Sequence, residues 1–153
     1  MEISPGWGAF AAFGLLSMLP QTVSAADPCK LLTAQEIGQV LGASISAPTP
    51  LGTTGCLWAG NSQRVSIVLR DATAWTRITM SVHGITKTSV SGLGEAASIS
   101  GLDEAGHQGK ENVLTLSVKQ GGSVIVLTVY GVKGADRQRS SEESLARLAL
   151  RRL

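Results

Sequence analysis

An apolar run near the N-terminus does most to limit what this chain can fold into, because it decides where the folded protein begins. Residues 7–19 read WGAFAAFGLLSML, and a proline and a polar stretch that ends in two alanines follow. An apolar centre, a helix-ending proline and small residues before the cleavage point are the order of a secretory signal peptide. The run is shorter than the ~20 apolar residues needed to span a bilayer. We therefore predict that residues 1–26 are a signal peptide and that residues 27–153 form the mature protein.

The composition of the chain fits one globular domain over residues 27–153. Apolar residues make up 43% of the sequence and charged residues 16%, whereas disordered chains are more charged and less apolar. The 13 basic and 11 acidic residues give a net charge of +2, a surplus too small and too dispersed to predict nucleic-acid binding. We expect a soluble exported protein, periplasmic or secreted, with no transmembrane span in its mature form.

The chain has two cysteines, Cys29 and Cys56, and both lie in the mature region. An even number of cysteines in an exported chain predicts a disulfide bond between them. No C-x-x-C motif and no histidine cluster lies nearby, which speaks against a redox pair or a zinc site. On the chain-entropy model, closing a loop of about 28 residues stabilises the fold by roughly 3 to 4 kcal/mol.

The first predicted helix has clear signals at both of its ends. Thr33 and Glu36 form a T-x-x-E capping box at the start, and Gly42 suits the C-cap position at the end. Between them, apolar residues recur at helical spacing. We therefore predict a helix over residues 34–41.

The next stretch of the chain carries strand patterns. A loop with one short strand at 44–47 leads to two strands, 55–59 and 64–70, whose alternating residues predict a hairpin. Residues 71–84 fit both a helix that Asp71 caps and an alternating strand, and three threonines weaken the helix. We favour the helix because it gives both halves of the chain the same order of elements.

The second half predicts three strands and a terminal helix. The strands are 96–100, 113–119 and 123–130, and the last of them is apolar on both faces, which places it in the middle of a sheet. Ser140 and Glu143 form a second capping-box pattern, so we expect the helix to open at Ser140. Its apolar face would consist of Leu145, Ala146, Ala149, Leu150 and Leu153.

Together these elements predict an α+β fold in a single domain, with an antiparallel β-sheet and helices packed on one face. A strand, a strand pair and a helix follow in the same order in residues 44–84 and in residues 96–153. This order predicts two pseudo-repeated strand-strand-strand-helix halves, alike in pattern and not in sequence.

Several short motifs along the mature chain resemble a known family. They are DPCKLLTAQEIGQVLG (27–42), GCLW (55–58), SGLGEAA (91–97), LTLSVKQGGSVIVLTVYG (114–131) and SLARLALRRL (144–153). They resemble a family of small exported domains of unknown function, best known as cell-envelope lipoproteins of actinobacteria. The resemblance implies pairing of Cys29 with Cys56 and an antiparallel sheet with helices on one side, and it implies no catalytic residues. Asp27 and Pro28 are not the small apolar residues that precede a lipid-attachment cysteine, so we expect no lipid anchor.

The sequence holds few candidates for catalysis. Residues 92–97 read GLGEAA, which matches the G-x-G-x-x-A pattern of dinucleotide sites, but Gly101 follows too soon for the helix that such a site needs. No G-x-S-x-G motif of serine hydrolases is present. A Gly-rich loop carries Asp103, Glu104 and His107, which could ligate a metal ion or serve a hydrolase, although a solvated loop explains them more simply.

Two further features concern binding. Trp58 follows Cys56 by two residues, where it either packs beside the disulfide bond or offers a stacking surface to a ligand, and we expect packing. Lys133, Arg137 and Arg139 lie in a polar stretch before the last helix. They form either a basic patch for anionic polymers or lipids of the envelope or a solvated surface.

We therefore expect a non-enzymatic, exported, disulfide-stabilised binding or accessory domain of the cell envelope that uses no cofactor. Its partner would be an envelope protein, a small ligand or an anionic polymer. Two alternatives remain open. One is a small periplasmic hydrolase or metal-dependent enzyme that uses Asp103, Glu104 and His107, and the other is a purely structural envelope protein.

Overall fold

The computed structural model describes residues 26–102 and 113–153 of the chain. The predicted signal peptide lies outside the described residues except for Ala26, and the loop that carries Asp103, Glu104 and His107 also lies outside them. The inferences about these two segments therefore stay predictions.

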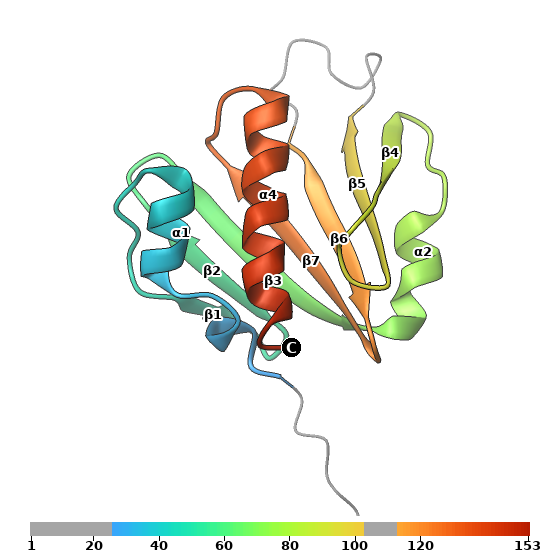
Figure 1. Cartoon of the computed structure of the whole chain (residues 1–153), viewed down its shortest axis with the longest axis horizontal. Coiled ribbons are helices and arrows are strands. Elements are labelled where there is room, and N and C mark those ends of the chain that lie inside the picture. Colours follow the sequence, from blue (N-terminus) through green and yellow to red (C-terminus); the bar gives the residue numbers. More distant parts are fainter. Residues whose placement is uncertain (1–25, 103–112) are drawn as a thin grey trace, which may run out of the picture.

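One sheet contains the strands β1 (Thr49–Leu51), β2 (Gly55–Ala59), β3 (Arg64–Asp71), β4 (Ile85–Val90), β5 (Ala96–Leu102), β6 (Thr115–Gln120) and β7 (Ser123–Tyr130). Their order is β1-β2-β3-β7-β6-β5-β4, and all neighbouring strands are antiparallel (Figure 1). This confirms the predicted α+β class with an antiparallel sheet. β7 lies in the middle, between β3 and β6, as its two apolar faces predict.

The sheet consists of two meanders. β1, β2 and β3 run from one edge to the centre, and β4, β5, β6 and β7 run from the opposite edge back to the centre. The meanders meet where β3 pairs with β7, from Arg64 opposite Tyr130 to Asp71 opposite Ser123.

The two edges of the sheet differ from the sequence prediction. The short strand expected at 44–47 is only an isolated bridge between Ile45 and Gly60, and the edge strand β1 follows it. At the opposite edge, the sequence patterns predict no element at β4, because this strand has polar residues on both faces and shows no apolar alternation.

Two helices cover one face of this sheet (Figure 1). They are α1 (Ala34–Leu41) and α4 (Ala135–Leu150); α1 packs against α4, which in turn packs against β6 and β7. The predicted capping box of α1 is present, because Glu36 N donates to Thr33 Oγ1 at 3.2 Å and Thr33 N donates to Glu36 Oε2 at 2.9 Å. Gly42 ends α1 in the left-handed conformation, with a φ of 67°.

The core lies between these two helices and the sheet. It includes Ile37 of α1, Leu145 of α4 and inward-facing strand residues such as Ile67, all of them fully buried. Because side chains alternate along a strand, the residues between the core positions face the other way. We call this side of the sheet, which carries Ser66 and Thr128, the back face.

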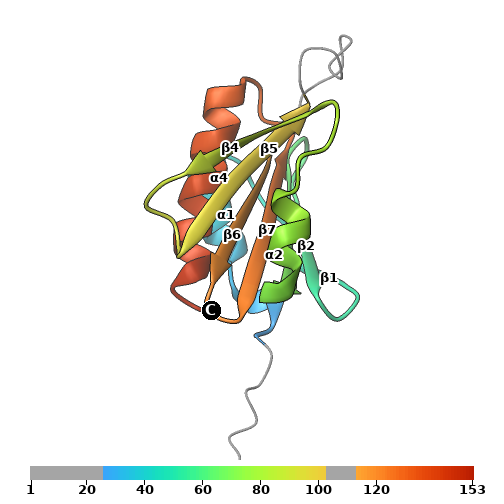
Figure 2. The ribbon, with the colours of Figure 1, turned by 90° about the vertical axis from the view of Figure 1, so that its right-hand side faces the viewer.

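The segment between β3 and β4 is helical only in its first part. It forms the 3-10 turn η2 (Ala72–Ala74) and the short helix α2 (Trp75–Thr79), and Asp71 caps it by accepting a hydrogen bond from a backbone N–H of η2. The predicted helix is therefore present up to Thr79 but does not continue to residue 84. Figure 2 shows α2 on the opposite side of the sheet from α4. Each half of the chain therefore forms a meander followed by a helix, but the two helices lie on opposite faces of the sheet.

The start of α4 differs from the sequence prediction. The helix begins at Ala135, and Ser140 lies inside it, where its carbonyl oxygen accepts a hydrogen bond from Ser144 Oγ at 2.8 Å. The predicted capping box at Ser140 is therefore wrong. The physical reason is tertiary: Gln138, in the first turns, is buried and bonded to the sheet, which extends the helix toward the N-terminus.

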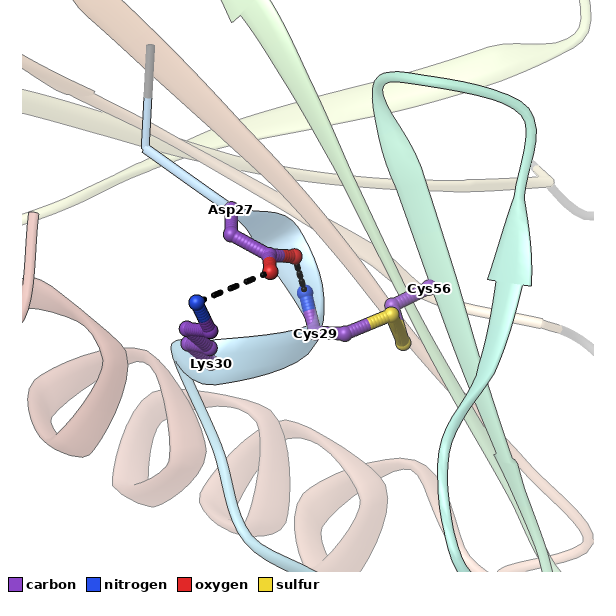
Figure 3. The surroundings of a disulfide bond; sticks show 4 residues. All are labelled: Asp27, Cys29, Lys30 and Cys56. Carbon is purple, nitrogen blue, oxygen red and sulfur yellow. Dashed lines mark hydrogen bonds and ion pairs between the residues drawn. A yellow bond between two sulfur atoms is a disulfide. The ribbon is translucent and has the colours of Figure 1, made fainter. Parts of the chain in front are cut away.

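The disulfide bond between Cys29 and Cys56 is present, as predicted. It joins the 3-10 turn η1 (Pro28–Lys30) to β2 (Figure 3). Asp27 lies beside it, accepts a hydrogen bond from Cys29 N at 3.0 Å and forms an ion pair with Lys30 at 3.6 Å. The bond thus fixes the first described residues of the chain to the core.

Candidate binding site

Two cavities flank the turn between β2 and β3. The larger one, of about 440 Å³, opens on the back face and is lined by residues of β1, β2, β3, β7 and the turn. The smaller one, of about 260 Å³, lies on the side of α1 and α4. Ser62, at the tip of the turn, lines both cavities.

Close backbone contacts fix this turn. Gly60 N donates to the carbonyl oxygen of Gln63 at 2.8 Å, which closes the turn itself. Gly131 follows β7 directly and has a φ of 76°, a conformation that favours glycine. A Cβ atom at Gly131 would lie 1.9 Å from the carbonyl oxygen of Ser62, so the absence of a side chain lets the end of β7 press against the turn.

Cross-strand pairs form the floor of the back-face cavity. Arg64 of β3 lies directly opposite Tyr130 of β7, and Ser66 of β3 lies opposite Leu57 of β2. Leu51 of β1 adds an apolar wall and is 44% exposed, and Tyr130 is 40% exposed. Ligand sites are concave, largely apolar and contain a few polar groups, and a volume of about 440 Å³ lies in their usual range.

The electrostatics of the back face favour a negative ligand. Arg64 forms no ion pair with any residue in 26–102 or 113–153. The back-face strand positions in these two ranges also hold Arg70, Lys87 and Lys119. They hold no acidic residue, because Asp71 at the end of β3 faces the same side of the sheet as the core residues. An anion bound beside Arg64 therefore meets positive potential and no like charge from the strands.

The helix-side cavity gathers part of the predicted basic patch. Lys133 and Arg137 both line it, together with Ser62 and Gln63 of the turn. Arg139 does not, and its Nε donates to Glu143 Oε1 at 2.9 Å instead. The structure therefore brings two of the three predicted basic residues together and places the third in a helix-surface ion pair.

Trp58 lies in the core and not in either cavity. Its side chain is completely buried, among residues of β2, β3, α1 and α4, and its indole N–H has no hydrogen-bond partner. The aromatic side chain in the back-face cavity is Tyr130, for which the sequence motifs predict no binding role. Its signal in the sequence is the alternation of β7, which turns a large residue at the strand end away from the core.

A buried carboxyl group on α4 is a further feature that the sequence patterns do not reveal. Glu142 Oε1 accepts a hydrogen bond from Val129 N at 3.1 Å, and Gln138 Nε2 donates to the carbonyl oxygen of Val129 at 2.7 Å. The β6–β7 pairing ends one residue earlier, at Thr115 opposite Thr128, so these two side chains bond the strand where β6 no longer does. Burial raises the pKa of Glu142 to about 7. Glu142 lines neither cavity and serves the packing of α4 on the sheet.

The described parts of the chain contain neither a metal-binding cluster nor a membrane-spanning helix. Within residues 26–102 and 113–153, no three His, Cys, Asp or Glu side chains group in a way that could hold a metal ion. None of the helices in these residues is both long and apolar enough to cross a lipid bilayer.

No family model, curated protein or solved structure matches the chain. The candidate site therefore rests on its own geometry.

Proposed function

We propose that this protein is an exported, non-enzymatic binding domain of the cell envelope that holds a small amphipathic anion in the back-face cavity. The observation that carries this proposal is the pairing of Tyr130 with Arg64 across β7 and β3, in a cavity that Leu51 and Leu57 also line. The predicted signal peptide, the disulfide bond and the resemblance to small exported domains support the export half of the proposal.

The apolar part of the ligand would pack against Tyr130, Leu51 and Leu57. These side chains leave apolar surface open to water in the free protein, and covering it provides a driving force that is roughly proportional to the area buried. An aromatic ring is well suited to this role, because it buries a large area at a small loss of conformational freedom.

The charged part of the ligand would bind Arg64. A guanidinium group donates two parallel hydrogen bonds to a carboxylate, phosphate or sulfonate, which fixes orientation as well as affinity. Ser66 and Asn61 line the same cavity and offer further hydrogen bonds to the anion. No acidic side chain competes for Arg64 within residues 26–102 and 113–153.

Two fluorescent probes test the site. Anilinonaphthalene sulfonate has both an apolar ring system and an anionic group, whereas phenylnaphthylamine has nearly the same ring system without the charge. We expect the mature protein to bind the sulfonate more tightly than the neutral probe. Arg64→Gln should remove this preference, and Tyr130→Ala should weaken the binding of both probes, in each case by about tenfold or less.

Arg70→Gln is the matched control, because Arg70 is an exposed arginine on the same strand and the same face but lies outside the cavity. It should leave both affinities within about twofold, since a distant exposed charge contributes little. Circular dichroism would establish that every variant is folded. Equal affinities of the wild type, Arg64→Gln and Tyr130→Ala for the sulfonate would refute the proposed site.

A further inference from the structure

We propose that the helix-side cavity is a second binding site, which shares only Ser62 with the back-face cavity, and that it takes a phosphate group. Four side chains with hydrogen-bond donors line it: Lys133 just before α4, Arg137 in the first turn of α4, and Ser62 and Gln63 from the turn between β2 and β3. The cavity volume of about 260 Å³ suits a small oxyanion and not a drug-sized ligand.

The donors of this cavity have no partner of their own in the described protein. Neither Lys133 nor Arg137 forms an ion pair in residues 26–102 or 113–153, and no side-chain hydrogen bond ties down Ser62 or Gln63 there. The other basic residues of α4 differ in this respect, since Arg139 and Arg147 both pair with Glu143. Two positively charged side chains thus line one cavity, and neither has an acidic partner within the described residues.

The charge balance at the cavity favours an anion. Two positive side chains that line one cavity repel each other, and an anion that contacts both adds two attractions, which outweigh this repulsion. The remaining lining residues, Leu41, Gly131 and Val132, contribute no acidic group. Asp136 precedes Arg137 along the helix but is exposed and does not line the cavity.

The chemistry of the donors fits phosphate in particular. Arginine presents a planar fork that matches two oxygens of a tetrahedral oxyanion, and lysine adds a point charge to a third. A serine hydroxyl and a glutamine amide supply neutral donors to the oxygens that remain. The close approach of Gly131 to Ser62 holds the backbone of the turn beside the segment that leads into α4, so the two pairs of donors lie on neighbouring segments.

Titration of the mature protein with inorganic phosphate, followed by amide chemical shifts in NMR spectra, tests this site. Sodium chloride at equal ionic strength is the reference, because screening alone moves shifts near exposed charges. We expect saturable shifts at the turn and at residues 131–137, and a loss of affinity of about tenfold in Arg137→Gln and in Lys133→Gln. Arg139→Gln, on the same helix, should leave the affinity within about twofold.

Two more phosphate compounds separate the possible sources of the group. Glycerol phosphate is a monoester, and dimethyl phosphate is a diester like the linkages of envelope polymers and lipids. Binding of inorganic phosphate and glycerol phosphate alone would assign the site to free phosphate or monoesters, whereas binding of dimethyl phosphate as well would extend it to diesters. The proposal fails if phosphate shifts the amides no more than chloride does, or if Arg139→Gln weakens binding as much as Arg137→Gln.

Discussion

The carboxyl group of Glu142 accepts a hydrogen bond from the backbone N–H of Val129 at 3.1 Å, in the buried interface between α4 and the sheet. The second oxygen of the carboxyl group, Oε2, is also buried and has no hydrogen-bond partner. Burial disfavours the charged form and raises the pKa of Glu142 from 4.5 to about 7, although the hydrogen bonds from Val129 and Gln138 act in the opposite direction. The folded protein therefore keeps this proton to a higher pH than the unfolded chain does.

This difference predicts that the free energy of unfolding falls as the pH rises from about 4.5 to about 7. Between these values the unfolded chain has lost the proton and the folded protein still binds it, so each step upward in pH favours unfolding. The total change from this group is about 3 kcal/mol. Urea denaturation at a series of pH values measures it. Glu142→Gln keeps the acceptor for Val129 N and cannot titrate, so its profile should be flatter, and an unchanged profile would contradict the prediction.

Glu36 predicts a pH dependence of the opposite sign. The side-chain hydrogen bonds from Arg152, at 2.7 and 2.9 Å, are the main cause that lowers the pKa of Glu36 to about 2. The stability from this pair is present above pH 4.5 and is lost as the pH falls toward 2. Arg152→Gln should lower the unfolding free energy near pH 5 and have little effect near pH 2. Arg151→Gln, its exposed neighbour, is the control and should show no such pH-dependent difference.

The disulfide bond predicts a large loss of thermal stability on its removal. Cys56→Ser opens a covalent loop that otherwise restricts the unfolded chain, at a loss of about 3 to 4 kcal/mol. For a domain of this size, calorimetry should show a melting temperature lower by about 10–15 °C. Dithiothreitol should lower the melting temperature of the wild type and leave that of a Cys29→Ser, Cys56→Ser double variant unchanged. Identical melting of the wild type with and without reductant would show that the bond does not restrain the chain.

We expect Gly131→Ala to destabilise the protein by more than the strain of the positive φ alone. In Gly131→Ala the new Cβ meets the carbonyl oxygen of Ser62, so the turn or the end of β7 has to move. Gly121→Ala is the matched control, because Gly121 also has a positive φ, of 57°, but open space around it. We expect a loss of about 1–2 kcal/mol for Gly121→Ala and a loss larger by roughly 1–3 kcal/mol for Gly131→Ala. If urea denaturation gave the same loss of unfolding free energy for both variants, the turn would be able to move away from the new Cβ at no cost, which would contradict the prediction.

The bounds of a helix can be predicted from the sequence where local hydrogen bonds set them, but not where contacts with distant residues set them. The capping box of Thr33 and Glu36 places α1 correctly because its bonds lie within four residues. The start of α4 is different, since the bond from Gln138 to Val129 depends on how the helix meets the sheet. A capping-box pattern at Ser140 is therefore outweighed by a tertiary contact.

The candidate site is harder to read from the sequence than the fold. The pairing of Arg64 with Tyr130 depends on the register between β3 and β7, two strands far apart along the chain. Alternation alone shows that both residues face away from the core, but not that they are neighbours. Lys133 and Arg137 could be recognised as basic residues, yet only the fold separates them from Arg139, which pairs with Glu143.

The contact of Arg152 with Leu31 and Glu36 places the last residues of the chain beside the beginning of the domain (Figure 1). The helix-side cavity, which Lys133 and Arg137 line, lies at the other end of α4, whose 16 residues span about 24 Å. A tether or sensor surface attached at Ala26 or at Leu153 would therefore lie about one helix length away from this cavity. Immobilised protein is for this reason suited to measuring ligand capture without steric hindrance from its support.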